Sequence, residues 1–149
     1  MGKEQIGKGV FMDGTFSRKD MTMGTILLIE RDDDQRLVYE KALMDEGYKV
    51  IPAKTAREAL WALKTNTPDV AVLDIMVSDM DGSELLGRLI SYSEKFPIII
   101  YTAYNGFGYR FMSMAADAFV IKSSDLTELK NRIRENVKKA HLKYNYVNN

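Results

Sequence analysis

The chain has 149 residues, and its 21 basic side chains balance its 21 acidic ones, so no net charge favours binding to nucleic acid or to an anionic membrane. It contains no cysteine, which excludes disulfides and thiolate catalysis, and its longest apolar runs are far shorter than a membrane span. We therefore expect a cytoplasmic protein with one domain and no membrane contact.

Five short apolar runs are predicted to be β-strands. Four of them are continuously apolar, as strands buried on both faces of a parallel sheet should be: residues 26–29, 70–73, 97–100 and 118–121. The run at 48–52 is more mixed, and its Pro52, which lacks an amide hydrogen, indicates an edge strand or a strand end.

Amphipathic segments between these runs are predicted to be helices, over residues 33–46, 56–65, 84–92 and about 125–140. Gly47 is expected to end the first helix. Thr55 and Glu58 have the spacing of a capping box at the start of the second, and Ser83 is expected to cap the third. The segment 104–116 gives a weaker helical pattern because two glycines interrupt it.

The alternation of strands and helices predicts an α/β fold. Repeated βαβ units produce a parallel sheet with right-handed crossovers and helices on both faces. The domain is expected to span 25–142. Residues 1–24 show no sustained periodicity and are predicted to be a tail or leader, and 143–149 a C-terminal tail.

Each of four buried runs ends in a polar residue, and the four are chemically complementary: Glu30, Asp74, Thr102 and Lys122. In an open parallel sheet, ligands bind beyond the carboxyl ends of the strands. A carboxylate there can attack a phosphoryl group, and Mg²⁺ is the usual cation that admits this anion to an acidic pocket. A hydroxyl and an ammonium can hold the remaining phosphoryl oxygens. The ordinary alternative is that each strand simply ends in a polar residue.

The segment PDVAVLDIMVSDMDGSELL at 68–86 resembles the phosphorylation-site segment of response-regulator receiver domains, the CheY-like family of two-component signalling. The resemblance runs from about residue 25 to 140. It includes ILLIE…R at the first strand, LDIM…MDG at the third, IYTA at the fourth and AADAFVIK at the fifth. It implies a five-stranded parallel sheet in the order 2-1-3-4-5.

The resemblance also implies a role for each matching residue. Asp74 would be the phosphoacceptor, Thr102 and Lys122 would act with it in catalysis, and Thr102, Ala103 and Lys122 would bind the phosphoryl group. Glu30, Asp74 and the Met76 carbonyl would bind Mg²⁺. Phe119 would be the aromatic switch, whose ring turns inward when Thr102 moves toward the phosphate.

Three positions depart from the family pattern. Arg31 replaces the second acid of the usual acidic pair, and an arginine cannot ligate Mg²⁺, so this cofactor is in doubt here. We predict that Arg31 enters the acidic pocket and pairs with Asp74 or Glu30; the alternative is that it turns outward. Ser123 replaces the proline after the lysine, which makes a cis peptide bond there less expected. Ser78 replaces a loop proline.

Three functional hypotheses follow. The first is a receiver in a phosphorelay, which takes a phosphoryl group on Asp74 from a histidine kinase or phosphotransfer protein and alters binding to an unknown output protein. The second is a pseudo-receiver that acts as an adaptor without phosphorylation. The third, an enzyme using Asp74 on a diffusible phosphate ester, lacks a convincing second catalytic acid. No DNA-binding or output domain is expected after Ala140.

The remaining features have ordinary explanations. Asp33 and Asp34 are expected to stabilise the start of the first helix through its dipole. Asp32 is a further candidate for the acidic pocket. His141 is expected on the surface. Trp61 is expected to pack partly under a neighbour, with a partner contact as the alternative. An interface or core role stays open for an aromatic and methionine cluster: Phe107, Tyr109, Phe111, Met112 and Met114.

Overall fold

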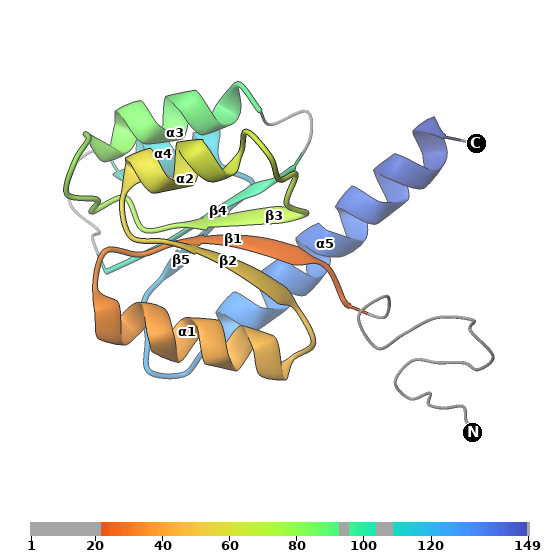
Figure 1. Ribbon diagram of the computed structural model, residues 1–149, viewed down its shortest axis with the longest axis horizontal. Helices are drawn as coiled ribbons and strands as arrows, with labels where there is room; N and C mark the ends of the chain where they lie inside the picture. Colours follow the sequence, from red (N-terminus) through yellow and green to blue (C-terminus); the bar gives the residue numbers. More distant parts are fainter. Residues whose placement is uncertain (1–21, 93–95, 104–108, 149) are drawn as a thin grey trace.

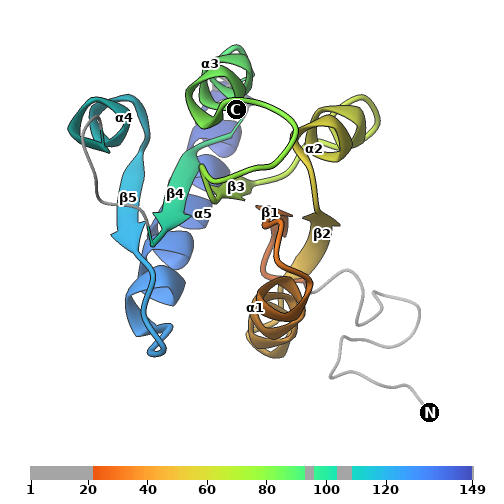
Figure 2. The same ribbon diagram turned by 90° about the vertical axis from the view of Figure 1, so that its left-hand side faces the viewer.

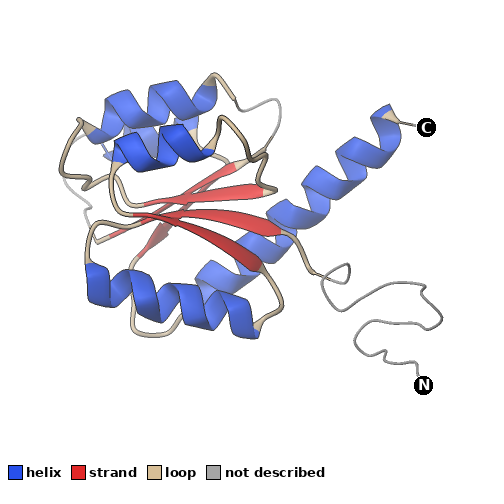
Figure 3. Cartoon of the chain, viewed as in Figure 1, coloured by secondary structure: helices blue, strands red, loops and turns tan. Residues whose placement is uncertain are grey.

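The computed structural model describes residues 22–92, 96–103 and 109–148. Its strands and helices alternate along the chain (Figures 1 and 3). The strands are β1 (Thr25–Ile29), β2 (Lys49–Ala53), β3 (Val70–Leu73), β4 (Ile98–Thr102) and β5 (Ala118–Ile121). The helices are α1 (Asp33–Asp45), α2 (Ala56–Ala62), α3 (Gly82–Ile90), α4 (Tyr109–Ala115) and α5 (Thr127–Val147).

The strands form one parallel sheet in the order β2-β1-β3-β4-β5, which confirms the expected fold. Helices α1 and α5 cover one face, and α2, α3 and α4 cover the other (Figures 1 and 2). β2 lies at the edge, as Pro52 indicated. The order places β1 and β3 side by side in the middle, so the segments that follow them emerge next to each other.

Both faces of the central strands are buried, which is why their sequences are continuously apolar. In β1, Leu27 and Ile29 pack toward α2 and α3, whereas Ile26 and Leu28 pack toward α1 and α5. The alternation follows from the strand period of two residues. The two resulting clusters hold the sheet rigidly between the helices, and its carboxyl-end rim is therefore fixed in position.

Local capping signals were correct at two helix ends and wrong at a third. Gly47 follows α1 with φ +98°, a conformation that glycine adopts without steric cost. The Thr55 hydroxyl accepts a hydrogen bond from the Glu58 amide at the start of α2. At α3 the cap is Asp81, whose carboxylate accepts from the Ser83 amide, so the helix begins at Gly82 and not after Ser83.

Helix α5 is longer than the sequence pattern predicted. It continues to Val147, so most of the segment that the sequence analysis assigned to a C-terminal tail is helical. Its final turns extend past the sheet and are exposed, and this is why the apolar periodicity that marks a packed helix fades there (Figure 1). Within the described residues, no helix combines the length and apolar character needed to cross a bilayer.

Asn136 is a buried polar side chain in α5 whose replacement should stabilise the protein. Its Nδ2 donates to the Arg132 carbonyl at 2.8 Å, but its buried Oδ1 accepts no hydrogen bond from any residue that the structure describes. Because an unsatisfied buried acceptor is costly, we expect Asn136→Leu to raise the free energy of unfolding by about 1 kcal/mol. Urea denaturation measures this, with the exposed Asn131→Leu as control. A decrease in the Asn136→Leu variant alone would contradict the expectation.

Candidate functional site

Four polar residues from four strand ends meet at one rim of the sheet. Glu30 follows β1, Asp74 follows β3, Thr102 ends β4 and Lys122 follows β5. The two carboxylates and the hydroxyl are buried, and only 13% of the Lys122 side chain is exposed. Figure 2 shows this end of the sheet facing the viewer. The sequence therefore identified side chains that the fold brings into direct contact.

Both carboxylate oxygens of Asp74 accept hydrogen bonds. Oδ1 accepts from the Thr102 hydroxyl at 2.9 Å and from the Met76 amide at 2.9 Å. Oδ2 accepts from Nζ of Lys122 at 2.7 Å. These three donors fix the carboxylate plane. They are also the kinds of group that hold a phosphoryl oxyanion: a hydroxyl, a backbone amide and an ammonium.

Lys122 is the cation that joins the two buried carboxylates. Its Nζ lies 2.7 Å from Glu30 Oε1 and 2.7 Å from Asp74 Oδ2. Burial by itself would lower the pKa of Lys122, but hydrogen bonds and charge attraction from Asp74 and Glu30 outweigh it, so the pKa is raised. The ammonium therefore stays charged and compensates part of the carboxylate repulsion.

Two side chains from α1, which the sequence did not single out, complete the environment of Lys122. Gln35 Oε1 accepts from Nζ at 2.7 Å and also from the Tyr39 hydroxyl at 3.0 Å. Nζ lies 5.7 Å from the centre of the Tyr39 ring, within cation–π range. Burial raises the pKa of the Tyr39 hydroxyl, so it remains a donor. Gln35 and Tyr39 are four residues apart, so they lie on the same side of α1, and this spacing is the one sequence feature that could have paired them.

The start of α1 holds Glu30 in place. The Asp32 amide donates to Glu30 Oε2 at 3.0 Å, and the Arg36 guanidinium donates to the Glu30 carbonyl at 2.9 Å. The carboxylate of Asp32 is the helix cap, accepting from the Gln35 amide. Asp32 thus contributes a backbone donor to the pocket, and its carboxylate caps α1.

Arg31 does not form the ion pair that we predicted. Its side chain is exposed at the start of α1. Among the described residues, the cation that joins Glu30 and Asp74 is Lys122. The physical reason is the direction of the chain: the side chain of Glu30, directly after β1, points into the pocket, so the next residue turns toward solvent. Arg31 still adds a positive charge beside the site where the family pattern has an acid.

The donor set fits Mg²⁺ only in part. No group of three or more His, Asp or Glu side chains converges on a metal position in the part of the chain that the structure describes. Glu30 and Asp74 nevertheless converge on one cation position, because each has an oxygen 2.7 Å from the same Nζ. Mg²⁺ is commonly held by one or two carboxylates with water completing its shell. The two residues therefore fit a weakly held Mg²⁺.

The other predicted positions lie around this centre. Ala103 is exposed directly after Thr102, and Met76 is exposed in the loop after Asp74. Phe119 is partly buried and packs against the core cluster beneath α2, α3 and α4. The described residues contain no cis peptide bond, so the bond between Lys122 and Ser123 is trans, as expected for a non-proline residue.

The aromatic and methionine cluster divides. Met112 packs against the core, and Met114 is 80% exposed. Phe107 lies outside the described residues, and Tyr109 and Phe111 are described only as part of helix α4. The cluster is therefore neither wholly core nor wholly surface.

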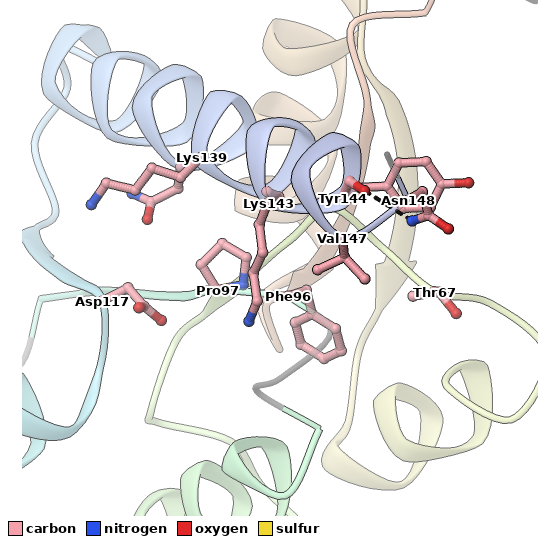
Figure 4. A pocket seen from close by; sticks show the side chains of 11 residues that line it. Thr67, Phe96, Pro97, Asp117, Lys139, Lys143, Tyr144, Val147 and Asn148 are labelled. Carbon is pink, nitrogen blue, oxygen red and sulfur yellow. Dashed lines mark hydrogen bonds between the residues drawn. The ribbon is translucent and has the colours of Figure 1, made fainter.

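A separate hollow lies at the opposite edge of the sheet, under the projecting part of α5. It has a volume of about 430 Å³, and Figure 4 shows Lys143 and Val147 reaching from α5 toward Phe96 and Pro97. His141 lies in this region too, 3.2 Å from the Asp69 carboxylate at the start of β3. None of these residues belongs to the Asp74 site, because Asp69 and Asp74 flank opposite ends of β3.

Comparison with known families agrees with this geometry. The sequence model of the response regulator receiver domain matches residues 26–134. The chain is 39% identical over 83 residues to the transcriptional regulatory protein AfsQ1 of Streptomyces coelicolor, covering 56% of this chain and 36% of that protein. It is 31% identical over 114 residues to the virulence transcriptional regulatory protein PhoP of Salmonella typhimurium, covering 75% of this chain and 51% of that protein. The chain thus spans about half of the length of these curated relatives, or less.

Solved structures show the same fold. The response regulator protein TrrA of Thermotoga maritima, crystallised with Mg²⁺ and BeF, is similar with a TM-score of 0.69 and 30% identity, over 74% of this chain and 96% of that one. TrrA in complex with histidine kinase ThkA matches with a TM-score of 0.68, 30% identity and the same coverage.

Proposed function

The chain belongs to the response regulator receiver domain family, and from this premise we propose that it accepts a phosphoryl group on Asp74 from a histidine kinase or phosphotransfer protein. Receiver domains are signalling domains, so the product is a modified protein whose partner binding changes. The observation that carries the proposal is the contact of Asp74 with both Thr102 and Lys122. The TrrA–ThkA complex supports a kinase as the donor.

The side chains around Asp74 suit this reaction. One carboxylate oxygen attacks phosphorus and forms an acyl phosphate, while the bond from phosphorus to the imidazole nitrogen of the donor histidine breaks and that nitrogen leaves with the electron pair. The Thr102 hydroxyl and the Lys122 ammonium, now on Asp74 oxygens, then turn to the new phosphoryl oxygens and hold them. Movement of Thr102 frees space toward β5, where Phe119 is only partly buried. A rotation of that ring would carry the change to the surface of α4 and β5.

Magnesium would be held by Glu30, Asp74 and the Met76 carbonyl, with water as the remaining ligands. When bound, it supplies positive charge to phosphoryl oxygens. TrrA was crystallised with Mg²⁺ and BeF, which supports this cofactor for the family. In this chain the same carboxylate oxygens hold Lys122, and the neighbouring Arg31 carries a like charge, so we expect weak binding.

A direct experiment tests phosphorylation. The full chain is incubated with acetyl phosphate and Mg²⁺, and its intact mass is measured over time. We expect one added phosphoryl group in the wild type and none in Asp74→Asn, and the exposed Asp45→Asn should behave as the wild type. If the wild type remains unmodified with acetyl phosphate and with phosphorylated histidine donors, the proposal is wrong.

A pseudo-receiver that acts as an adaptor without phosphorylation is the second candidate, and Arg31 is the observation that favours it. Lys122 already neutralises part of the pocket charge in this structure, which is the charge that a bound metal ion would otherwise neutralise. Partner affinity compared between the phosphorylated wild type and Asp74→Asn separates the two. Equal affinities favour the adaptor, whereas a large difference favours the phosphorylated receiver.

Arg31→Asp should strengthen Mg²⁺ binding. The change removes one positive charge beside the pocket and adds the acid that the family pattern has there, so the attraction for a divalent cation increases. We expect about tenfold tighter binding, equal to about 1.4 kcal/mol, and faster phosphorylation of Asp74. Calorimetric titration with Mg²⁺ measures the first, and Arg31→Gln is the control for charge loss alone. Equal Mg²⁺ affinity in the wild type and Arg31→Asp would refute this expectation.

A further inference from the structure

A groove between α2 and α3 lies outside the Asp74 pocket and plays no part in the proposed phosphorylation. It has a volume of about 600 Å³. Helix α2 supplies one wall, helix α3 the other, and the loop before α3 forms the floor. The lining residues are Arg57, Leu60, Trp61, Lys64, Asp79, Met80, Arg88, Ser91 and Tyr92.

Trp61 is the feature of this groove that packing does not explain. Trp61 is 69% exposed, so the predicted packing under a neighbouring side chain covers only a small part of it. Its ring lies beside Lys64, whose Nζ is 4.8 Å from the ring centre. An exposed tryptophan beside a groove is the kind of residue that dominates binding energy in protein interfaces. Partner binding, the alternative left open by the sequence, is therefore the better explanation.

The charge of the groove is positive. Arg57, Lys64 and Arg88 line it, against one acid, Asp79. Both carboxylate oxygens of Asp79 accept backbone hydrogen bonds at the start of α2, from Ala56 at 2.9 Å and Arg57 at 3.0 Å. Burial opposes ionisation of Asp79, but these backbone bonds outweigh it and lower its pKa. The single acid thus caps the start of α2. Arg88 is paired with Glu84 at 2.8 Å, so the positive charge of the groove comes mainly from Arg57 and Lys64.

From these observations we propose that the α2–α3 groove docks an acidic peptide segment of a partner protein, with one aromatic or leucine side chain anchored against Trp61 and Leu60. The cations match carboxylates of the segment, and the half-buried Leu60 and Met80 provide the apolar surface for its anchor. A single-stranded nucleic acid could also stack on a tryptophan. The peptide is favoured because the apolar residues fit a side chain and the chain as a whole carries no net charge.

Selection from a peptide library tests the proposal with acidic, basic and neutral sequences in direct competition. A library of random dodecapeptides is selected on the immobilised full chain and counter-selected on Trp61→Ala, whose exposed ring is not needed for folding. We expect enriched peptides with at least two acidic residues near an aromatic residue or leucine. Failure to enrich peptides that depend on Trp61, or enrichment of basic ones, overturns the proposal.

Binding of an enriched peptide, labelled with fluorescein, is then measured by anisotropy. We expect about thirtyfold weaker binding to Trp61→Ala and about tenfold weaker binding to Lys64→Glu. Lys138→Glu, a charge reversal on the exposed face of α5, should bind as the wild type. Trp61 is the single tryptophan of the chain, so its emission should shift to the blue with unlabelled peptide. Equal loss in Lys138→Glu, or tighter binding of a thymidine dodecanucleotide, refutes peptide docking.

Discussion

Replacing Lys122 with methionine is expected to lower the free energy of unfolding by about 3 kcal/mol at pH 7, because it leaves two buried carboxylates without their shared cation. Nζ of Lys122 holds Glu30 and Asp74 at 2.7 Å each. Methionine keeps much of the side-chain volume, so the loss reports charge and not packing. Urea denaturation followed by circular dichroism measures it.

The pH dependence of this loss follows from the raised pKa of Lys122. A group whose pKa is higher in the folded protein stabilises the folded state, and the full stabilisation is present when the pH is below the pKa of the unfolded chain. For this lysine that pKa is ordinarily 10.5. That stabilisation is lost as the pH rises through the folded pKa. The difference between the wild type and Lys122→Met should therefore be constant near neutral pH and shrink in strongly alkaline solution.

Two control variants make the Lys122→Met result specific. Lys41→Met changes a lysine that is 80% exposed, and it should alter stability by less than about 0.5 kcal/mol. Adding Asp74→Asn to Lys122→Met should restore part of the loss, because one of the repelling charges is gone. A loss below about 1 kcal/mol in Lys122→Met would contradict the role of Lys122 as the structural cation of the site.

Gly82→Ala is expected to lower the free energy of unfolding by about 3 kcal/mol, because the added methyl group has no space. A Cβ at Gly82 would overlap the carbonyl oxygen of Ile75. Ile75 directly follows Asp74, so the shift that relieves the overlap should also move the phosphoacceptor. We expect phosphorylation of Asp74 by acetyl phosphate to slow along with the loss of stability. Thermal unfolding and intact-mass kinetics measure the two effects.

Gly87→Ala is the matched control on the same helix. A Cβ at Gly87 meets no atom within 4 Å, and the position is exposed. Alanine should therefore stabilise α3 by about 0.5–1 kcal/mol through its better helix propensity and leave phosphorylation unchanged. Similar effects in Gly82→Ala and Gly87→Ala would mean that helix propensity, and not the contact with Ile75, decides the outcome.

The layered α/β fold of this protein could be predicted from its amino-acid sequence. Strands buried on both faces must be apolar at every position, and this requirement made β1, β3 and β4 recognisable without any tertiary information. The run at 118–121 was expected to be buried in the same way, but β5 lies at the edge of the sheet and its Ile121 is 43% exposed. The chain direction then placed Glu30, Asp74, Thr102 and Lys122 at the same rim, because parallel strands share their carboxyl ends. The strand order came from the family resemblance, since periodicity carries no information about which strands are neighbours.

Which side chains touch one another could not be predicted in the same way, because it depends on how the elements pack. Arg31 and Lys122 are both long cations near the acidic pair, and sequence spacing does not distinguish an inward from an outward side chain. The direction of the chain after β1 turned Arg31 to solvent, and the ammonium of Lys122 reached the acids from the end of β5. Gln35 joined the site through a hydrogen bond to Lys122, which lies 87 residues further along the chain. No local pattern encodes such long-range contacts. The exposure of Trp61 on α2 could not be predicted either, because it depends on which elements pack against that side of the helix.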